Sequence, residues 1–222
     1  MVAVVGLVSV AFTLGATTGL RRSWPLAGAY EWLSRQASPY DFRANPSYRI
    51  RSALYAVRKS RRITMIGDSL TEYADWSLLL GRPDVGNQGI TGDVSAGVLA
   101  RLYPSVTGSQ VVFLNIGIND PAHFVTAMET QANIRHIVEV LSRGSKVYVQ
   151  SLILTRRSDL NRYVQVTNEF LQMFCDGKMC TYVDLNARLA KDGMLNESFA
   201  LDAVHLNENG YLQWAAAIAP LI

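Results

Sequence analysis

Apolar residues of this chain cluster in short runs, and longer amphipathic stretches separate the runs. Short apolar runs without a polar alternation are typical of strands that are buried on both faces of a sheet. The stretches between the runs have the spacing of apolar residues that favours helices. The predicted strands are 62–67, 84–89 (the weakest of the set), 110–117, 146–153 and 180–185, and the predicted helices are 71–80, 94–103, 121–143, 159–175 and 207–219.

Strands that alternate with helices predict a parallel sheet with helices on both faces, connected by right-handed crossovers. The expected fold class is therefore α/β, a three-layer α/β/α sandwich with a five-stranded parallel sheet of the flavodoxin-like kind. The longest helix is expected to begin with Asp120 as its N-cap and Pro121 at its first position. Ligands bind such folds at the carboxyl ends of the strands, so polar residues that follow strands are the candidates for chemistry.

The first twenty residues contain no charged side chain, and Arg21 and Arg22 follow them. This length is sufficient to cross a bilayer, so residues 1–22 are interpreted first as a membrane span. A cleaved signal peptide is the second interpretation, although no Lys or Arg precedes the apolar run and no A-x-A site closes it. A buried core helix is the third. The first two predict a membrane-associated or exported protein, and the side of the membrane stays open.

Charge is distributed unevenly along the chain, although the formal net charge is only +3. Residues 1–62 hold ten Arg and Lys but two acids, so residues 23–60 are interpreted as a basic N-terminal arm and 61–222 as the catalytic domain. The rest of the chain is mildly acidic, which excludes a nucleic-acid surface of clustered cations. Residues 49–62 carry six basic residues and no acid. This segment is either a solvated helix face or a surface for anionic lipid.

The two cysteines, Cys175 and Cys180, lie too close together for a zinc pattern, and no second pair exists. Outside the cytoplasm, a local disulfide that closes this turn is expected; inside, two buried thiols are expected.

Four polar clusters follow predicted strands or precede the last helix, and together they contain the groups that acyl transfer requires. A serine hydroxyl, Ser69, needs an imidazole as its base, and His205 is available. The imidazole needs a carboxylate, and Asp202 lies three residues before it. Oxyanion donors are the backbone N–H groups of Ser69 and Gly92 and the side-chain amide of Asn119. Because these residues follow different strands, we expect them to meet at one edge of the sheet.

Four sequence blocks carry a resemblance to a known family: "GDSL" (67–70), "GNQGITGDVSAG" (86–97), "GIND" (117–120) and "DAVHLN" (202–207). In type and order they resemble the blocks of the GDSL, or SGNH, hydrolases, in the bacterial branch of platelet-activating-factor acetylhydrolase-type enzymes and carbohydrate acetylesterases. The resemblance implies Ser69 as nucleophile, His205 as base and Asp202 as its partner. It implies Ser69, Gly92 and Asn119 as oxyanion donors, and no metal or cofactor. The serine is not in a G-x-S-x-G elbow, which disfavours a lipase of the α/β-hydrolase type.

Other polar residues of these blocks have structural interpretations. Asp68 is expected to bond its own turn, Asp93 to cap the next helix, and Asn87 to support its loop. His123 and His136 are expected to be exposed on the long helix.

The expected function is a metal-independent serine esterase that hydrolyses a short, acetyl-type ester, with a small molecule or a glycan as the alcohol. A lysophospholipase or thioesterase of the same family is the alternative within enzymes. A membrane-tethered glycan-binding module is the alternative outside them, but it would not need Ser69, Asp202, His205 and Asn119 together. A flavodoxin-like nucleotide site, which would bind flavin, is a third alternative. Acyl length, alcohol and oligomeric state stay open.

Overall fold

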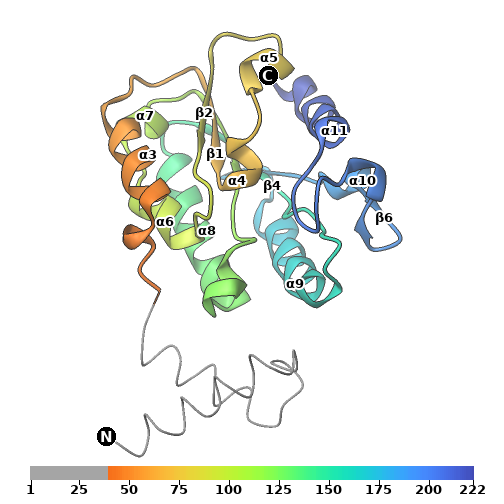
Figure 1. Cartoon of the computed structure of the whole chain (residues 1–222). Coiled ribbons are helices and arrows are strands. Elements are labelled where there is room, and N and C mark those ends of the chain that lie inside the picture. The colour runs from red at the N-terminus through yellow and green to blue at the C-terminus, as the bar shows by residue number, and fades with distance from the viewer. Residues whose placement is uncertain (1–39) are drawn as a thin grey trace, which may run out of the picture. The chain divides into compact units, whose positions relative to one another are not determined.

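A five-stranded parallel sheet, in the order β2-β1-β3-β4-β5, lies at the centre of the computed structural model, which describes residues 40–222 (Figure 1). Every residue of β1 is buried, which is why its sequence is almost continuously apolar. The arrangement confirms the predicted α/β/α sandwich. The strands are β1 Ile63–Gly67, β2 Val85–Gly89, β3 Val111–Asn115, β4 Lys146–Gln150 and β5 Thr181–Val183.

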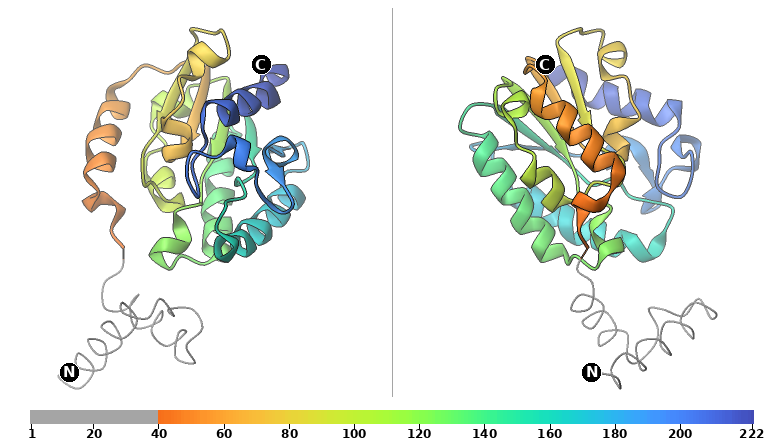
Figure 2. Two further views of the ribbon diagram at one scale, coloured as in Figure 1. Left: turned by 45° about the vertical axis from the view of Figure 1, so that its right-hand side comes forward. Right: turned by 60° about the vertical axis from the view of Figure 1, so that its left-hand side comes forward.

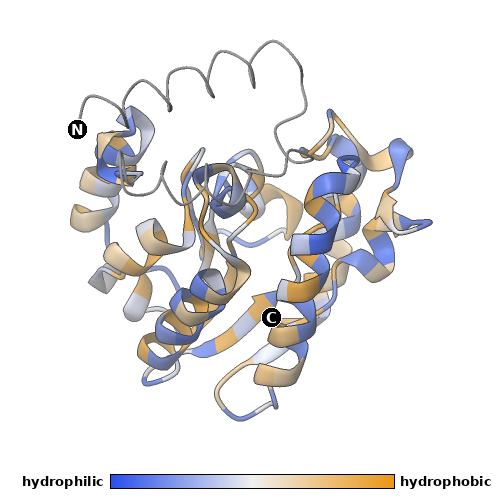
Figure 3. Cartoon of the chain, turned by 90° about the horizontal axis from the view of Figure 1, so that it is seen from below, coloured by the Kyte–Doolittle hydropathy of each residue, from blue (hydrophilic) through white to orange (hydrophobic). Residues whose placement is uncertain are grey.

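Helices cover both faces of the sheet (Figure 2). On one face lie α6 (Ser95–Ala100), α8 (Ala127–Leu141) and α9 (Ser158–Phe174), with α8 packed between the other two. On the other face lie α5 (Trp76–Leu79), α10 (Asn186–Leu189) and α11 (Glu208–Ile218). The helices are striped with hydrophilic and hydrophobic residues, as amphipathic helices of a sandwich are expected to be (Figure 3).

The predicted helix 71–80 is two short helices in the structure, α4 (Ser69–Glu72) and α5. The break occurs because the carboxylate of Asp75 accepts a hydrogen bond from the N–H of Leu78 and starts a second helix. The new helix directs Trp76 into the core, where its ring packs edge-on against Trp214 at 5.0 Å.

The long helix also begins later than predicted. Asp120 starts a short 3-10 helix, Asp120–His123, which ends at Phe124 with a positive φ of 60°. The N-cap of α8 is Thr126, which forms a capping box with Glu129. The prediction that Asp120 caps the long helix is therefore wrong, because a complete capping box lies farther along the chain.

Helix α3 (Pro46–Val57) belongs to the same compact unit as the sheet, and this unit begins at Phe42. It thus starts earlier than residue 61, where the sequence analysis set the start of the catalytic domain. The predicted span or signal segment, residues 1–22, lies outside the described residues. Within residues 40–222, no helix combines the length and the apolar character that crossing a membrane requires.

Cys175 and Cys180 form a disulfide, which is the arrangement expected outside the cytoplasm; the compartment itself stays a prediction.

The connection from β5 to α11 contains α10 and a small antiparallel pair of strands. The remaining elements are α7 (Pro104–Thr107), β6 (Ala190–Lys191), β7 (Met194–Leu195) and the 3-10 helices Phe42–Ala44, Glu197–Phe199 and Ala219–Leu221.

Candidate active site

Ser69 is the first residue of α4 and follows the carboxyl end of β1 after one intervening residue, Asp68. The strand approaches its neighbours too closely here for any side chain at Gly67. A Cβ at that position would lie 2.2 Å from the carbonyl oxygen of Asn115 and 2.3 Å from Oγ1 of Thr71. This tight turn places the serine hydroxyl at the sheet edge, where Ser69 is 5% exposed.

The imidazole of His205 meets this hydroxyl from the far end of the chain. Its Nε2 lies 3.0 Å from Oγ of Ser69, and its Nδ1 lies 2.8 Å from Oδ2 of Asp202. If Nδ1 carries the proton and donates it to the carboxylate, Nε2 is left to accept the serine O–H. The structure thus brings Ser69, His205 and Asp202 into one hydrogen-bonded row, as the sequence predicted.

The turn that contains Asp202 fixes its carboxylate and its charge. Its Oδ1 accepts hydrogen bonds from the N–H groups of Val204 and His205, each at 2.7 Å. Partial burial raises the pKa of Asp202, but these backbone hydrogen bonds and the imidazole outweigh it and lower the pKa to about 2. The carboxylate is therefore ionised at any ordinary assay pH.

The three candidate oxyanion donors come from α4, the loop after β2 and the loop after β3. Gly92 has a φ of 74° in a turn that is closed by a 3.0 Å bond from the N–H of Asp93 to the carbonyl of Ile90. Asn119 donates from Nδ2 to the carbonyl of Asp93, at 2.9 Å, so its amide is held against this turn. Within residues 40–222, the N–H groups of Ser69 and Gly92 have no hydrogen-bond acceptor.

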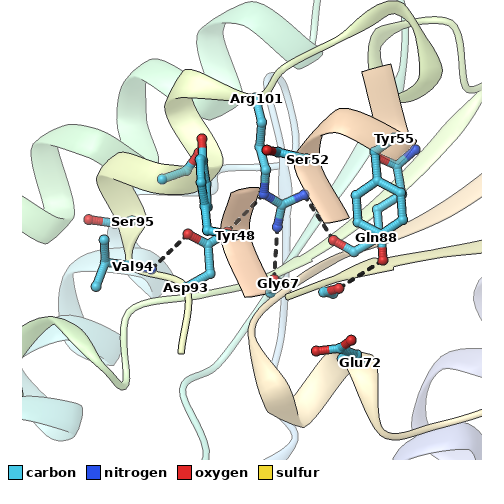
Figure 4. A network of polar contacts seen from close by, with 12 residues as sticks. Tyr48, Ser52, Tyr55, Gly67, Glu72, Gln88, Asp93, Val94, Ser95 and Arg101 are labelled. Carbon is cyan, nitrogen blue, oxygen red and sulfur yellow. Dashed lines mark hydrogen bonds and ion pairs between the residues drawn. The ribbon is translucent and has the colours of Figure 1, made fainter. Parts of the chain in front are cut away.

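A fully buried arginine, Arg101, connects two of the segments that carry these donors, the end of β1 and the loop after β2 (Figure 4). Its Nε donates to Oδ2 of Asp93, at 2.8 Å, and its Nη1 and Nη2 donate to the carbonyls of Gln88 and Gly67, each at 2.9 Å. One guanidinium therefore ties the ends of β1 and β2 to the loop of Gly92. The prediction that Asp93 caps the next helix is wrong, because α6 has no side-chain cap and this carboxylate is the buried partner of Arg101.

Asp120 is buried and supports the same region. It accepts hydrogen bonds from the N–H and Oγ of Ser95 and from Oγ1 of Thr130. Burial raises its pKa, although these donors act in the opposite direction. Asp120 thus joins the loop after β3 to both α6 and α8.

Two residues close to Ser69 were not predicted as site residues: Glu72, the last residue of α4, and Tyr73, which follows it as the C-cap. Glu72 accepts hydrogen bonds from the N–H and Oγ1 of Thr91 and forms an ion pair with Arg51 at 2.7 Å. It therefore holds the loop next to Gly92. Tyr73, which is 53% exposed, stacks on the ring of His205 at 5.3 Å. Glu72 and Tyr73 follow Ser69 by three and four residues, a spacing that places side chains on one face of a helix. This spacing was the sequence signal that could have identified them.

The supporting role predicted for Asn87 is confirmed, because its Nδ2 lies within 3.1 Å of the carbonyls of Thr71, Glu72 and Ala74. His136 is exposed, as predicted, whereas His123 is half-buried and burial lowers its pKa. Neither histidine belongs to the hydrogen-bonded set Ser69–His205–Asp202. No group of three or more potential metal ligands occurs in the part of the chain that the structure describes.

Asp68 bonds its own turn, as predicted, because its Oδ1 accepts from the N–H of Leu70 at 3.0 Å. It is fully buried, its Oδ2 has no partner among the described residues, and burial raises its pKa to about 7.

The raised pKa of Asp68 makes the free energy of unfolding depend on pH. An unfolded aspartate titrates near pH 4, so between about pH 4 and 7 the folded protein binds the extra proton and stability falls as pH rises, by about 1 kcal/mol per pH unit. Asp68→Asn keeps an acceptor for Leu70 but cannot ionise. We expect it to remove this slope and to be more stable than the wild type at pH 8 in urea unfolding. An unchanged slope would show that Asp68 is not its source.

Known proteins are similar to this chain in sequence pattern and in fold. The model of the GDSL-like lipase/acylhydrolase family matches residues 65–212, which include all five predicted site residues. No curated protein matches the sequence significantly.

Three solved structures illustrate the similarity in fold. A GDSL-like lipase from Bacteroides thetaiotaomicron is 20% identical, with a TM-score of 0.69, over 78% of this chain and 96% of that chain. A member of the lipolytic G-D-S-L family from Veillonella parvula is 19% identical (TM-score 0.63; 72% and 97%). An acetylxylan esterase from Geobacillus stearothermophilus is also 19% identical (TM-score 0.62; 74% and 95%). Since the family model covers most of the chain, the protein belongs to the GDSL-like lipase/acylhydrolase family and is a carboxylic-ester hydrolase.

Proposed function

We propose that this protein is a serine esterase that removes a short acyl group, of acetyl size, from a small-molecule or glycan alcohol. The observation that carries the proposal is the row Ser69–His205–Asp202, with contacts of 3.0 and 2.8 Å. Such a row activates a hydroxyl that is otherwise a weak nucleophile.

In the proposed reaction, Oγ of Ser69 attacks the ester carbonyl while Nε2 of His205 takes the hydroxyl proton. Asp202 remains ionised and stabilises the imidazolium through Nδ1. The negative charge on the carbonyl oxygen is stabilised by the N–H groups of Ser69 and Gly92 and by the amide of Asn119. The C–O bond to the alcohol then breaks, and His205 gives its proton to the leaving oxygen.

The resulting acyl-enzyme is hydrolysed by the reverse sequence of proton transfers. Water attacks the acyl carbonyl, His205 takes a proton from it, and the tetrahedral intermediate expels the Ser69 oxygen, which regains its proton from His205. No metal or cofactor is needed in either half of this reaction.

The preference for a short acyl group is supported by the acetylxylan esterase among the similar structures, since that enzyme's ester carries an acetyl group. A serine-to-alanine variant of the same esterase is described as a catalytic mutant. These similarities support the choice of an acyl group of acetyl size.

A series of p-nitrophenyl esters of increasing chain length tests the proposal, together with labelling by a fluorophosphonate. We expect kcat/KM to fall as the acyl chain lengthens. We also expect one mole of label to attach to Ser69 per mole of protein. Rates that rise with chain length would favour a lysophospholipase. No adduct on the folded protein would favour a binding module.

Asn119→Ala tests the proposed oxyanion site. Losing one donor to the developing oxyanion is expected to lower kcat by about 10²-fold or more, with a smaller change in KM, because the interaction strengthens in the transition state. Steady-state kinetics with p-nitrophenyl acetate measure both values. The matched control is Asn209→Ala, an exposed asparagine on α11, which should retain wild-type kinetics. An equal loss in both variants would contradict the assignment.

A further inference from the structure

Helix α3 presents an apolar stripe to solvent. Ile50, Leu54 and Val57 are 63%, 56% and 83% exposed. Their spacing of four and three residues places them on one face of the helix. The opposite face carries Tyr48 and Tyr55, which are buried. The stripe is therefore the outer side of an element whose inner side is already packed.

The domain holds α3 in this orientation through buried hydrogen bonds. The hydroxyl of Tyr48 donates to the carbonyl of Gly97 at 3.1 Å, and that of Tyr55 donates to the carbonyl of Gly89 at 2.9 Å. The helix lies on the outside of its layer (Figure 2). It cannot rotate to bury the stripe without breaking both hydrogen bonds.

Cations border the stripe and continue beyond the end of the helix. At about 100° per residue, Arg49 lies on one side of the stripe and Arg51 and Arg58 lie on the other. Arg51 is paired with Glu72, and Arg62 lies 3.7 Å from Asp84. The other four cations of the segment have no acidic partner among the described residues: Arg49, Arg58, Lys59 and Arg61.

We propose that this outer face of α3 lies on an anionic lipid bilayer. The apolar stripe would enter the boundary between headgroups and acyl chains, while the bordering arginines extend to the phosphates. The excess of cations matches the charge of an anionic membrane surface. The uncharged sequence of residues 1–20, close along the chain, has the composition and length to add a second membrane contact.

Other occupants fit this face less well. A second copy that packs through the same face would bring the unpaired cations onto each other. Residues 1–39 offer a single acid, Glu31, against three arginines, so they do not complement the charge. A nucleic acid would complement the charge but would leave the apolar stripe without a role.

An environment-sensitive fluorophore at position 54 tests the proposal on the full chain. Leu54→Cys provides a single reactive thiol, because Cys175 and Cys180 are joined. The labelled protein is mixed with vesicles of phosphatidylcholine alone, or with added phosphatidylglycerol. With the anionic vesicles only, we expect a blue shift and about threefold or more weaker quenching by aqueous iodide. The matched control is Met173→Cys on α9, which is 77% exposed and should respond to neither vesicle.

Charge reversal separates a lipid contact from a chance apolar contact. Arg49→Glu with Lys59→Glu should abolish the response at position 54 and leave the melting temperature unchanged. Arg143→Glu, an exposed cation after α8, should retain the response. Equal quenching in both vesicles overturns the proposal. Protection from iodide in the absence of vesicles also overturns the proposal. Protection that rises with protein concentration would indicate a second copy, and protection that does not depend on concentration would indicate the chain's own residues.

Discussion

Replacing Ser69 with alanine is expected to lower kcat for p-nitrophenyl acetate by about 10⁴-fold or more. The hydroxyl whose oxygen lies 3.0 Å from Nε2 of His205 is the proposed nucleophile, and no acyl-enzyme forms without it. The KM should change little, because the hydroxyl contributes to bond formation more than to ground-state binding. Burst kinetics and mass spectrometry of the trapped acyl-enzyme measure the loss directly.

The matched control is Ser158→Ala, at the exposed start of α9, which should retain wild-type kcat and KM. The melting temperature of Ser69→Ala should stay within a few degrees of the wild type, since the substitution removes one small polar atom. A folded Ser69→Ala variant with wild-type activity would refute the mechanism. His205→Ala gives an independent check, because it should cause a loss of the same order as Ser69→Ala.

Arg101→Met is expected to reduce the free energy of unfolding by about 3–5 kcal/mol at pH 8. The variant leaves the carboxylate of Asp93 buried without its charged partner, and it also removes the donors to the carbonyls of Gln88 and Gly67. Urea unfolding measures the change through the midpoint at constant slope. Because the guanidinium ties the end of β1 to the loop of Gly92, activity of the folded fraction should also fall.

The pH dependence of the stability loss in Arg101→Met tests whether the buried carboxylate of Asp93 causes it. Burial already raises its pKa, and removal of the arginine raises it further. The folded variant therefore holds a proton that the unfolded chain releases near pH 4, so its stability falls as pH rises above that value. The deficit should be smaller at pH 5 than at pH 8. The control is Arg82→Met, which removes a partly exposed surface pair with Asp84 and should leave the midpoint nearly unchanged.

Much of the site could be predicted because the relevant signals are local. The apolar runs mark the strands, and the carboxyl ends of parallel strands share one edge of the sheet. Ser69, Gly92 and Asn119 each follow a strand, so their convergence follows from topology. Asp202 and His205 are three residues apart, so one turn brings them together.

The rest of the site depends on contacts between residues that are far apart in the sequence, and a local sequence pattern does not contain such contacts. The sequence around Asp93 has the features of a helix cap, but Arg101 is the partner that defines its role. Asp120 and Pro121 resemble a helix start, yet the capping box at Thr126 begins the helix. The pairing of Glu72 with Arg51 requires knowing that α3 lies beside the loop of Thr91.

The turn that joins Asp202 to His205 has a consequence for how this chemistry can originate. The acid and the base are held together by hydrogen bonds within four consecutive residues, so their mutual geometry needs no support from the sheet. The contacts of His205 that span the fold, the 3.0 Å contact with Ser69 and the stack on Tyr73, both lead to one short segment of the chain. A short C-terminal insert could therefore bring a ready-made acid–base couple to an existing serine, and recombination or design would have to satisfy the geometry of that one segment.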